Sequence, residues 1–308
     1  MTPLFLEFIL HTMIRLFFPR HTSIYYGIIF FISIFSFADI ANAEWVERIT
    51  DLEGGLLYES NINRSSFDSD KRSDTAFIPS VSLGRYNQLT DSTRLRATVD
   101  FEFGQYNNFK MLNYNKAGIT LAIRQKMGFG SDAPWLRPHF SAGYTDVSSD
   151  NRDSYLYEAG LRVGKQLTPE LDGRIGYVYN LRDGKTDVFD QRGYTLSIEG
   201  SYILTNRMLL TGGYSYWYGD FDSAYTYNNI TRISASEDVK AITTDNAFGE
   251  QFCIYRLAGK ANTISLLASY SFFDGHGSLN VGYQQQNGKA YYLDYLNSII
   301  RVSFIYSF

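Results

Sequence analysis

Beyond residue 43 the chain offers few residues whose chemistry points to catalysis or metal binding. His139 stands two positions from Ser141, a spacing that puts both side chains on one face of a strand. A serine nucleophile also needs a third group that orients its base, and no carboxylate is placed by the sequence beside this pair. The single cysteine, Cys253, cannot form an internal disulfide, and His276 falls in a predicted turn. Histidine and cysteine show no metal-ligand spacing, so we expect no catalytic site, no metal and no cofactor.

Arginines and carboxylates, in contrast, recur on one side of segments whose sequence alternates. The stretch 93–104, TRLRATVDFEFG, sets arginines and acids against leucine, valine and phenylalanine. The charged residues predicted to share the polar face are Arg94, Arg96, Asp100, Glu102, Arg124, Arg137, Glu158, Arg162, Asp172, Arg174, Glu199 and Arg301. Such a set either lines a selective pore or forms an internal network of ion pairs that conducts nothing. We favour the pore, because serine, threonine and glycine on the same face leave space.

The elements that position these charges are predicted to be strands with one apolar face. Period-two alternation recurs in 118–125, 135–146, 171–180 and 277–287. In a soluble sandwich the apolar face would be the core, whereas a membrane barrel turns it toward lipid and the polar face toward the lumen. Strands of about ten residues suit a tilted bilayer crossing. Short connections alternate with long polar ones, which is typical of outer-membrane barrels.

The strand count predicts an all-β fold, a transmembrane antiparallel up-and-down β-barrel of about 12 strands. A further strand in 249–259 would make 14 with a partner that the sequence does not place. The segment 220–260 is predicted to be a long extracellular loop. It would fold into the barrel mouth and constrict it, project outward as a binding surface, or extend the neighbouring strands. We favour the constriction, because its carboxylates would pair with lumen arginines.

The N-terminus has the features of a secretory signal peptide. Arg15 and Arg20 precede the apolar run IYYGIIFFISIFSF, and Ala41 and Ala43 form an A-x-A cleavage site. We expect residues 1–43 to be cleaved and the mature protein to be 44–308. An uncleaved anchor helix is the alternative.

The last residues, RVSFIYSF, alternate and end on an aromatic residue. Phe304, Tyr306 and Phe308 resemble the C-terminal signal of Gram-negative outer-membrane β-barrel proteins, by which the barrel assembly machinery recognises its substrates. The stretch 56–65, LLYESNINRS, is similar to the first strand of several uncharacterised barrel families, including the barrel part of surface lipoprotein assembly modifiers. Those modifiers carry a helical-repeat domain for which this chain has no room. The resemblance therefore implies fold and compartment, not activity.

Composition narrows the function further. The formal net charge is −4, which argues against a nucleic-acid partner. We expect a bacterial outer-membrane protein that contacts membrane lipid, lipopolysaccharide and the assembly machinery, and that admits small solutes. A narrow pore is the favoured function. A non-conducting structural or surface-interaction barrel is the alternative, a lipid-modifying enzyme is a distant third, and we do not expect an enzyme.

Overall fold

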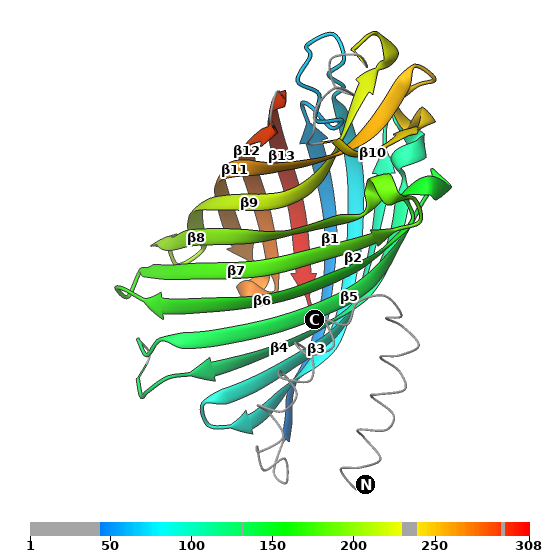
Figure 1. Cartoon of the computed structure of the whole chain (residues 1–308). Helices are drawn as coiled ribbons and strands as arrows, with labels where there is room; N and C mark the ends of the chain where they lie inside the picture. Colours follow the sequence, from blue (N-terminus) through cyan, green and yellow to red (C-terminus); the bar gives the residue numbers. More distant parts are fainter. Residues whose placement is uncertain (1–43, 131, 230–238, 291–292) are drawn as a thin grey trace, which may run out of the picture. The chain divides into compact units, whose positions relative to one another are not determined.

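A computed structural model describes residues 44–130, 132–229, 239–290 and 293–308. Thirteen antiparallel strands dominate it (Figure 1). Their bounds are β1 Glu44–Glu59, β2 Asp74–Thr90, β3 Thr93–Tyr106, β4 Tyr114–Lys126, β5 Trp135–Val147, β6 Ser154–Gln166, β7 Leu171–Gly184, β8 Gln191–Thr205, β9 Met208–Thr226, β10 Val239–Thr244, β11 Phe252–Phe272, β12 Gly277–Ala290 and β13 Leu293–Ser307. Short 3₁₀ turns are η2 Lys110–Leu112, η3 Asp150–Arg152, η4 Asp187–Phe189, η5 Tyr227–Asn229, η6 Asn246–Phe248 and η7 Phe273–Gly275. No helix among these residues is long and apolar enough to cross a membrane.

Twelve of the strands close into a ring. Each pairs with its neighbour in sequence, except that β9 pairs directly with β11, and β13 pairs with β1 to complete the circle. Closure matters because lipid cannot hydrogen-bond the free edge of a sheet. The predicted 12-strand up-and-down barrel is therefore confirmed.

The extra strand is not the one that the sequence suggested. Residues 252–259 do not form a separate crossing, because β11 runs unbroken over 21 residues. The thirteenth strand is β10, which lies outside the ring and pairs with Cys253–Leu257 of β11. The 14-strand alternative is therefore wrong.

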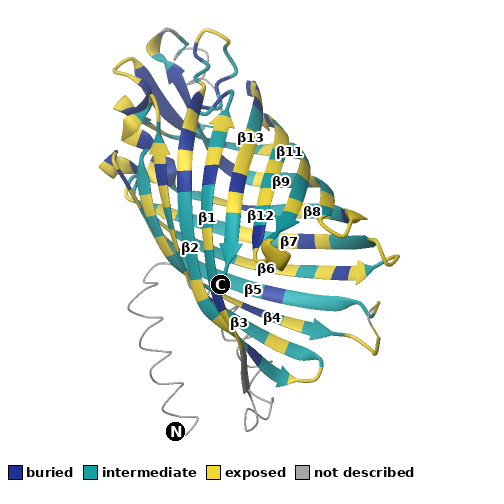
Figure 2. Cartoon of the chain, turned by 180° about the vertical axis from the view of Figure 1, so that it is seen from behind, coloured by how far each residue is buried: buried dark blue, intermediate teal, exposed yellow. Residues whose placement is uncertain are grey.

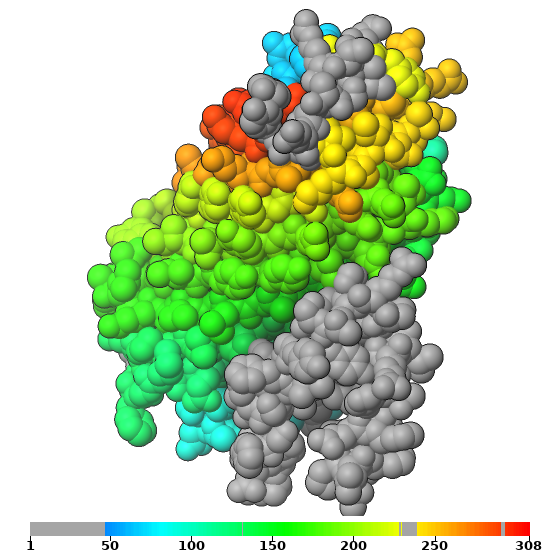
Figure 3. Space-filling model, viewed as in Figure 1, coloured from blue at the N-terminus to red at the C-terminus, as the bar shows by residue number. Residues whose placement is uncertain are grey.

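The outer wall of the barrel is apolar and exposed. Leu56, Ile175 and Leu266 have 61%, 63% and 61% of their surface exposed, although all three lie in the middle of the sheet. The same face carries Val99, Phe101, Ile119, Leu121, Leu196, Ile198, Val281 and Ile300, all exposed. In Figure 3 the side chains of β6 to β9, green to yellow-green, form a continuous wall. A soluble protein would bury these residues, so the wall is suited to lipid.

The two ends of the barrel differ. At one end, here called the turn end, short connections join β2 to β3, β6 to β7 and β8 to β9. At the other, the loop end, the connections 60–73, 107–113, 148–153 and 185–190 carry much of the buried surface, dark blue in Figure 2. The packed interior of this protein therefore lies mainly at the loop end.

Much of the segment 220–260 is strand. Asp220–Thr226 continue β9 and pair with Phe252–Ala258 of β11, and β10 adds to the outer edge of that extension. Residues 230–238 lie outside the described residues. The part 245–248 turns back over the barrel mouth, as the next section describes. In this segment, residues 220–226, 239–244 and 252–260 extend the sheet, whereas residues 245–248 pack at the mouth.

Candidate functional site

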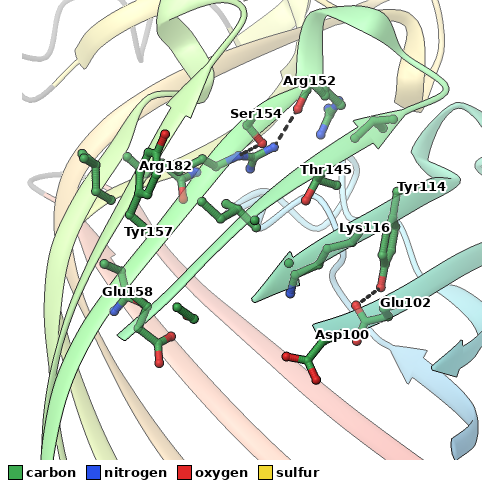
Figure 4. A pocket seen from close by; sticks show the side chains of 18 of the residues that line it. Asp100, Glu102, Tyr114, Lys116, Thr145, Arg152, Ser154, Tyr157, Glu158 and Arg182 are labelled. Atoms are coloured by element: carbon green, nitrogen blue, oxygen red, sulfur yellow. Dashed lines mark hydrogen bonds between the residues drawn. The ribbon is translucent and has the colours of Figure 1, made fainter. Parts of the chain in front are cut away.

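The barrel contains a cavity, lined by both charged and apolar side chains, that reaches from mid-barrel to the loop end. Its volume is about 860 Å³, and three of the predicted pore-lining residues line it: Asp100, Glu102 and Glu158. Figure 4 shows Asp100, Glu102 and Lys116 directed toward the same space. Glu199 lines a second, smaller cavity of about 250 Å³ among β8, β9, β11, β12 and β13. The alternation of each strand accounts for this, because every second side chain points inward.

Two acidic residues of the cavity are held by hydroxyl groups. Asp100 accepts hydrogen bonds from Ser82 at 2.6 Å, from Thr120 at 2.9 Å and from Thr98 at 3.1 Å. Glu102 accepts one from the Tyr114 hydroxyl at 2.8 Å. Such bonds fix these carboxylates in position without neutralising them, and because Arg64, Lys116, Arg152 and Arg182 line the same cavity, its wall carries charge of both signs.

The structure brings a carboxylate to the histidine that the sequence singled out. His139 Nε2 lies 2.8 Å from Glu158 Oε1 on the neighbouring strand. Gly160 makes room for this contact, since a Cβ atom there would stand 2.2 Å from His139 Cε1. No hydrogen bond joins His139 to Ser141 within the described part of the chain. The histidine therefore has an orienting acid but no attached nucleophile.

Two of the predicted lumen arginines are paired with acids. Arg174 lies 3.1 Å from Asp172 and 3.9 Å from Glu199. Arg301 lies 2.8 Å from Glu53, across the seam where β13 meets β1. The sequence placed these residues on one face but not in pairs, because the pairing depends on strand register.

The other five predicted lumen arginines lie together near the turn end of β3 to β6: Arg94, Arg96, Arg124, Arg137 and Arg162. None of the ion pairs in the described residues includes any of them. The predicted charged lumen is thus divided around the barrel: near the turn end, β7 and β8 carry Arg174 with its acids, whereas β3 to β6 carry arginines without an ion pair.

An apolar cluster packs at the loop end, and we call it the cap. Its buried members come from four separate regions of the chain: Leu112, Val188, Phe189, Ala224, Ala247, Phe248, Phe252 and Ile254. The rings of Phe109 and Phe248 meet edge to face with centroids 5.4 Å apart. Arg152 and Phe248 also line the large cavity. The cap therefore borders that cavity at the loop end.

A buried ion pair lies within the cap. Arg152 Nε is 2.8 Å from Asp245 Oδ2, and the Asp245 side chain is fully buried. The guanidinium also lies 4.8 Å from the ring centroid of Phe189 and 5.4 Å from that of Phe248. Asp245 further accepts a hydrogen bond from the backbone N–H of Ala247 and so caps the N-terminus of η6. One carboxylate thus ties η6 to η3.

The connection 60–73 is held beside the cap by hydrogen bonds and an ion pair to β9. Asn63 donates to the Ala224 carbonyl oxygen at 3.0 Å, and Asp70 accepts from the Thr226 backbone N–H at 2.9 Å. Burial alone would raise the pKa of Asp70, but hydrogen bonds from Thr226, Asn229 and Ser69 bring that pKa below its ordinary value. Arg64 forms a 2.8 Å ion pair with Asp222. Burial opposes the charge of Arg64, yet Asp222, Tyr295 and Glu59 raise its pKa overall.

Sequence reasoning missed the residues of the cap. Arg152, Asp245, Arg64 and Asp222 belong to loops or strand extensions, where no alternation identifies a face. The one available signal was the phenylalanine content of these otherwise polar connections, at Phe109, Phe189 and Phe248.

The C-terminal aromatic residues line the outer face at the turn end. Phe304 and Phe308 are exposed, and the Phe308 ring meets the Tyr306 ring edge to face at 4.7 Å. Ser307 donates instead to Asp51 at 2.6 Å. Ala41 and Ala43, the predicted cleavage residues, lie outside the described residues. No group of three or more potential metal ligands occurs in the described ranges.

Comparisons with known proteins support the fold. No protein-family model matches the chain, and no curated protein does. Among solved structures, an outer membrane channel from Pseudomonas putida F1 has a TM-score of 0.54 at 12% identity, over 86% of this chain and 97% of that one. The outer membrane channel DcaP of Acinetobacter baumannii has a TM-score of 0.44 at 10% identity, over 88% and 99%. The translocator domain of the autotransporter NalP from Neisseria meningitidis has 0.44 at 12%, over 90% and 93%. The chain has the fold of an outer-membrane β-barrel protein.

Proposed function

We propose that the protein is a narrow outer-membrane pore for small polar solutes. The observation that carries this proposal is the cavity of about 860 Å³, lined by both charged and apolar side chains, inside a closed barrel whose outer wall is apolar. A barrel that served only as a scaffold would fill its interior with packed side chains, as small barrels do. Here hydroxyl-held carboxylates border open space, so water and small solutes have a polar surface to follow.

The orientation follows the rule for bacterial barrels. Short turns face the periplasm and long connections face outward, so the turn end would be periplasmic and the cap external. Residues 1–43 would act as a signal peptide cleaved after Ala43. Lipopolysaccharide would surround the loop end, and the assembly machinery would read Phe304, Tyr306 and Phe308.

Catalysis is the weaker proposal. His139 and Glu158 form an oriented pair, but the nearest candidate nucleophile on the same face, Ser141, is not hydrogen-bonded to the histidine in the described structure. We infer transport in place of acyl transfer, because a nucleophile without its base has little reactivity near neutral pH.

Conductance of the refolded protein in planar lipid bilayers tests the proposal. We expect discrete single-channel steps that grow with salt concentration. Folding is checked first by the shift in gel mobility that barrels show on heating. If folded protein shows no conductance, either unmodified or with the cap removed, the pore proposal is wrong.

A second function has one observation in its favour. The cap is packed from four regions of the chain and contains a buried ion pair. A permanently sealed mouth would suit a structural or surface-interaction barrel. The two proposals differ in their expected conductance. A pore with a movable cap conducts intermittently while the cap is present and continuously once the cap is removed, whereas a structural barrel conducts in neither state.

A further inference from the structure

Five arginines form a continuous patch on neighbouring strands, here called the arginine patch. Arg94 and Arg96 lie on β3, Arg124 on β4, Arg137 on β5 and Arg162 on β6. The register sets Arg94 opposite Arg124, and Arg137 opposite Arg162. On β4 and β5 the pairs Ala122–His139 and Gln125–Leu136 bracket Arg124 and Arg137, which are therefore at the same level. The patch is thus one cluster and not five scattered charges.

The patch faces the lumen. On each of its four strands, one arginine stands four positions from a residue that lines the large cavity. The pairs of arginine and cavity residue are Arg96 and Asp100, Arg124 and Thr120, Arg137 and Ser141, and Arg162 and Glu158. An even spacing keeps side chains on one face, and four residues span about 13 Å. The patch therefore continues the cavity wall toward the turn end.

No arginine of the patch forms an ion pair within the described structure, and the acid that acts on it electrostatically, Glu158 on Arg162, does so from beyond ion-pair distance. Arg94 donates to the Gln88 side chain at 2.7 Å. The guanidinium groups of Arg96 and Arg124 lie over aromatic rings, Tyr86 at 5.9 Å and Trp135 at 4.8 Å. The Nε atom of Arg96 is buried without a hydrogen-bond partner among the described residues. Neutral contacts hold these groups in place but leave their charge free to act.

The lack of acids is a local property of the patch. On the next strand, β7, Arg174 lies near the same level, two positions beyond Arg162 in the register, and it is paired with Asp172 and Glu199. On the cavity wall above the patch, Asp100 is engaged by hydroxyl groups and Glu158 by His139, while Asp91 and Asp132 lie in the turn-end connections. Like charges at close range repel one another, and a bound anion would relieve that repulsion.

We propose that the arginine patch binds the anionic group, a carboxylate or a phosphate, of a small solute inside the barrel. Guanidinium groups match such groups because they donate two parallel hydrogen bonds to one planar or tetrahedral anion. This inference rests on the proposed pore and assigns it a substrate class, small anions. An anion entering past the acids of the cavity would be received by the patch before it leaves at the turn end.

Ion selectivity gives the first test. Reversal potentials are measured under a KCl gradient for the native chain, for Arg137→Gln/Arg162→Gln, and for Arg192→Gln as control. Arg192 is exposed on the outer face of β8, so it loses the same charge type outside the lumen. We expect preference for chloride in the native chain and in the control, and loss of that preference in the double variant. Native protein that conducts with no anion preference would overturn the proposal.

Calorimetric titration gives a test that needs no conduction. Folded protein in detergent is titrated with inorganic phosphate and, separately, with succinate, which distinguishes phosphate from carboxylate recognition. We expect binding of at least one, about a hundredfold weaker after Arg137→Gln/Arg162→Gln, since each of the two arginines supplies a charge-assisted hydrogen bond worth about one order of magnitude. Arg137→Lys/Arg162→Lys should keep anion preference but bind less tightly, because lysine lacks the paired donors.

The outcomes separate the two proposals. Anion binding without any conductance would contradict the proposed pore but would support the proposed anion site. Conductance without binding of either anion, in protein that folds normally by heat-shifted mobility, would sink the site and leave the pore. Equal affinity in native and double-variant protein would also sink the site.

Discussion

Asp245 is the residue whose loss should open the cap. Asp245→Asn keeps the size of the side chain but leaves Arg152 buried without its counter-charge. The Nη2 atom of Arg152 already lacks a hydrogen-bond partner in the described structure. Breaking a buried ion pair on one side costs about 3–5 kcal/mol. We expect faster amide hydrogen exchange in 245–254, measured by mass spectrometry.

The matched control is Asp68→Asn. Asp68 forms a 2.6 Å ion pair with Lys71, but its side chain is 94% exposed. Exposed pairs contribute little, so exchange in the connection 60–73 should not change. Unaltered exchange around 245–254 in the Asp245 variant would mean that the cap is held by its apolar cluster alone.

Asp70 makes the loop end sensitive to acid. Its folded pKa is below its ordinary value, so its stabilisation is complete above the unfolded pKa of about 4. That stabilisation is lost as the pH falls through the lower folded pKa. A fluorophore on Ser73→Cys, an exposed position, should keep constant anisotropy between pH 8 and pH 5 and become mobile only below about pH 4.

Asp70→Asn serves as the control for that titration. The amide cannot ionise, so the part of the acid transition that Asp70 causes should disappear. An unchanged transition in this variant would assign it to another carboxylate.

The strands themselves show how far the sequence alone predicts this molecule. The predicted ranges 135–146 and 171–180 begin at the residues where β5 and β7 begin, because each strand crosses the apolar belt with one face in lipid. The predicted loop 220–260 contains the start of β11, which begins at Phe252. Phe252, Cys253, Ile254 and Tyr255 are buried in succession, with packing on both faces, so alternation is lost there. Alternation predicts a strand only where the two faces meet different surroundings.

The candidate site was predictable to the same extent. The face of each lumen residue follows from strand periodicity, but its partner follows from the register between strands. His139 with Glu158 and Arg174 with Glu199 are cross-strand contacts of that kind. Burial in the cap depends on loop conformation, which no periodic pattern encodes.

The lipid-facing wall of β11 gives a prediction for a whole element. Leu266→Arg would place a charge in the apolar belt, at a cost of about 2–4 kcal/mol near the bilayer midplane. Ser265→Arg on the opposite, lumen-facing side should cost much less. Urea unfolding of both variants in lipid vesicles measures the difference, and equal losses of unfolding free energy would contradict the assigned faces.

The last strand gives a prediction about assembly. Phe308 is 68% exposed on the outer face, whereas Ser307 is hydrogen-bonded to Asp51. Phe308→Asp should lower the yield of heat-modifiable barrel in cells far more than Ser307→Ala, because the exposed aromatic residue is available for recognition. Similar yields of folded protein from the two variants would argue against an aromatic signal.

At the scale of the whole molecule, the cap should limit conduction. Deleting residues 234–245 removes β10 and the carboxylate that pairs with Arg152. Single-channel conductance should then rise, since the loop-end mouth loses part of its packing. Ile242→Ser, on an exposed position of β10, is the control and should leave conductance unchanged. A folded deletion variant that conducts like the native chain would assign this segment to the outer surface alone.

The hydrogen bonds beside the cap join residues that are far apart along the chain. The backbone N–H of Asn61 donates to the side-chain oxygen of Asn297, 236 positions away, and the Asn63 side chain donates to the Ala224 carbonyl oxygen, 161 positions away. Contacts of such sequence separation form late, because the chain between them must be ordered first. Asn61 and Asn297 flank the seam where β1 meets β13, so their bond requires a ring that has already closed. A chain whose ring is still open therefore cannot form the hydrogen bonds beside the cap. Protection of the loop end from solvent would mark the completion of folding.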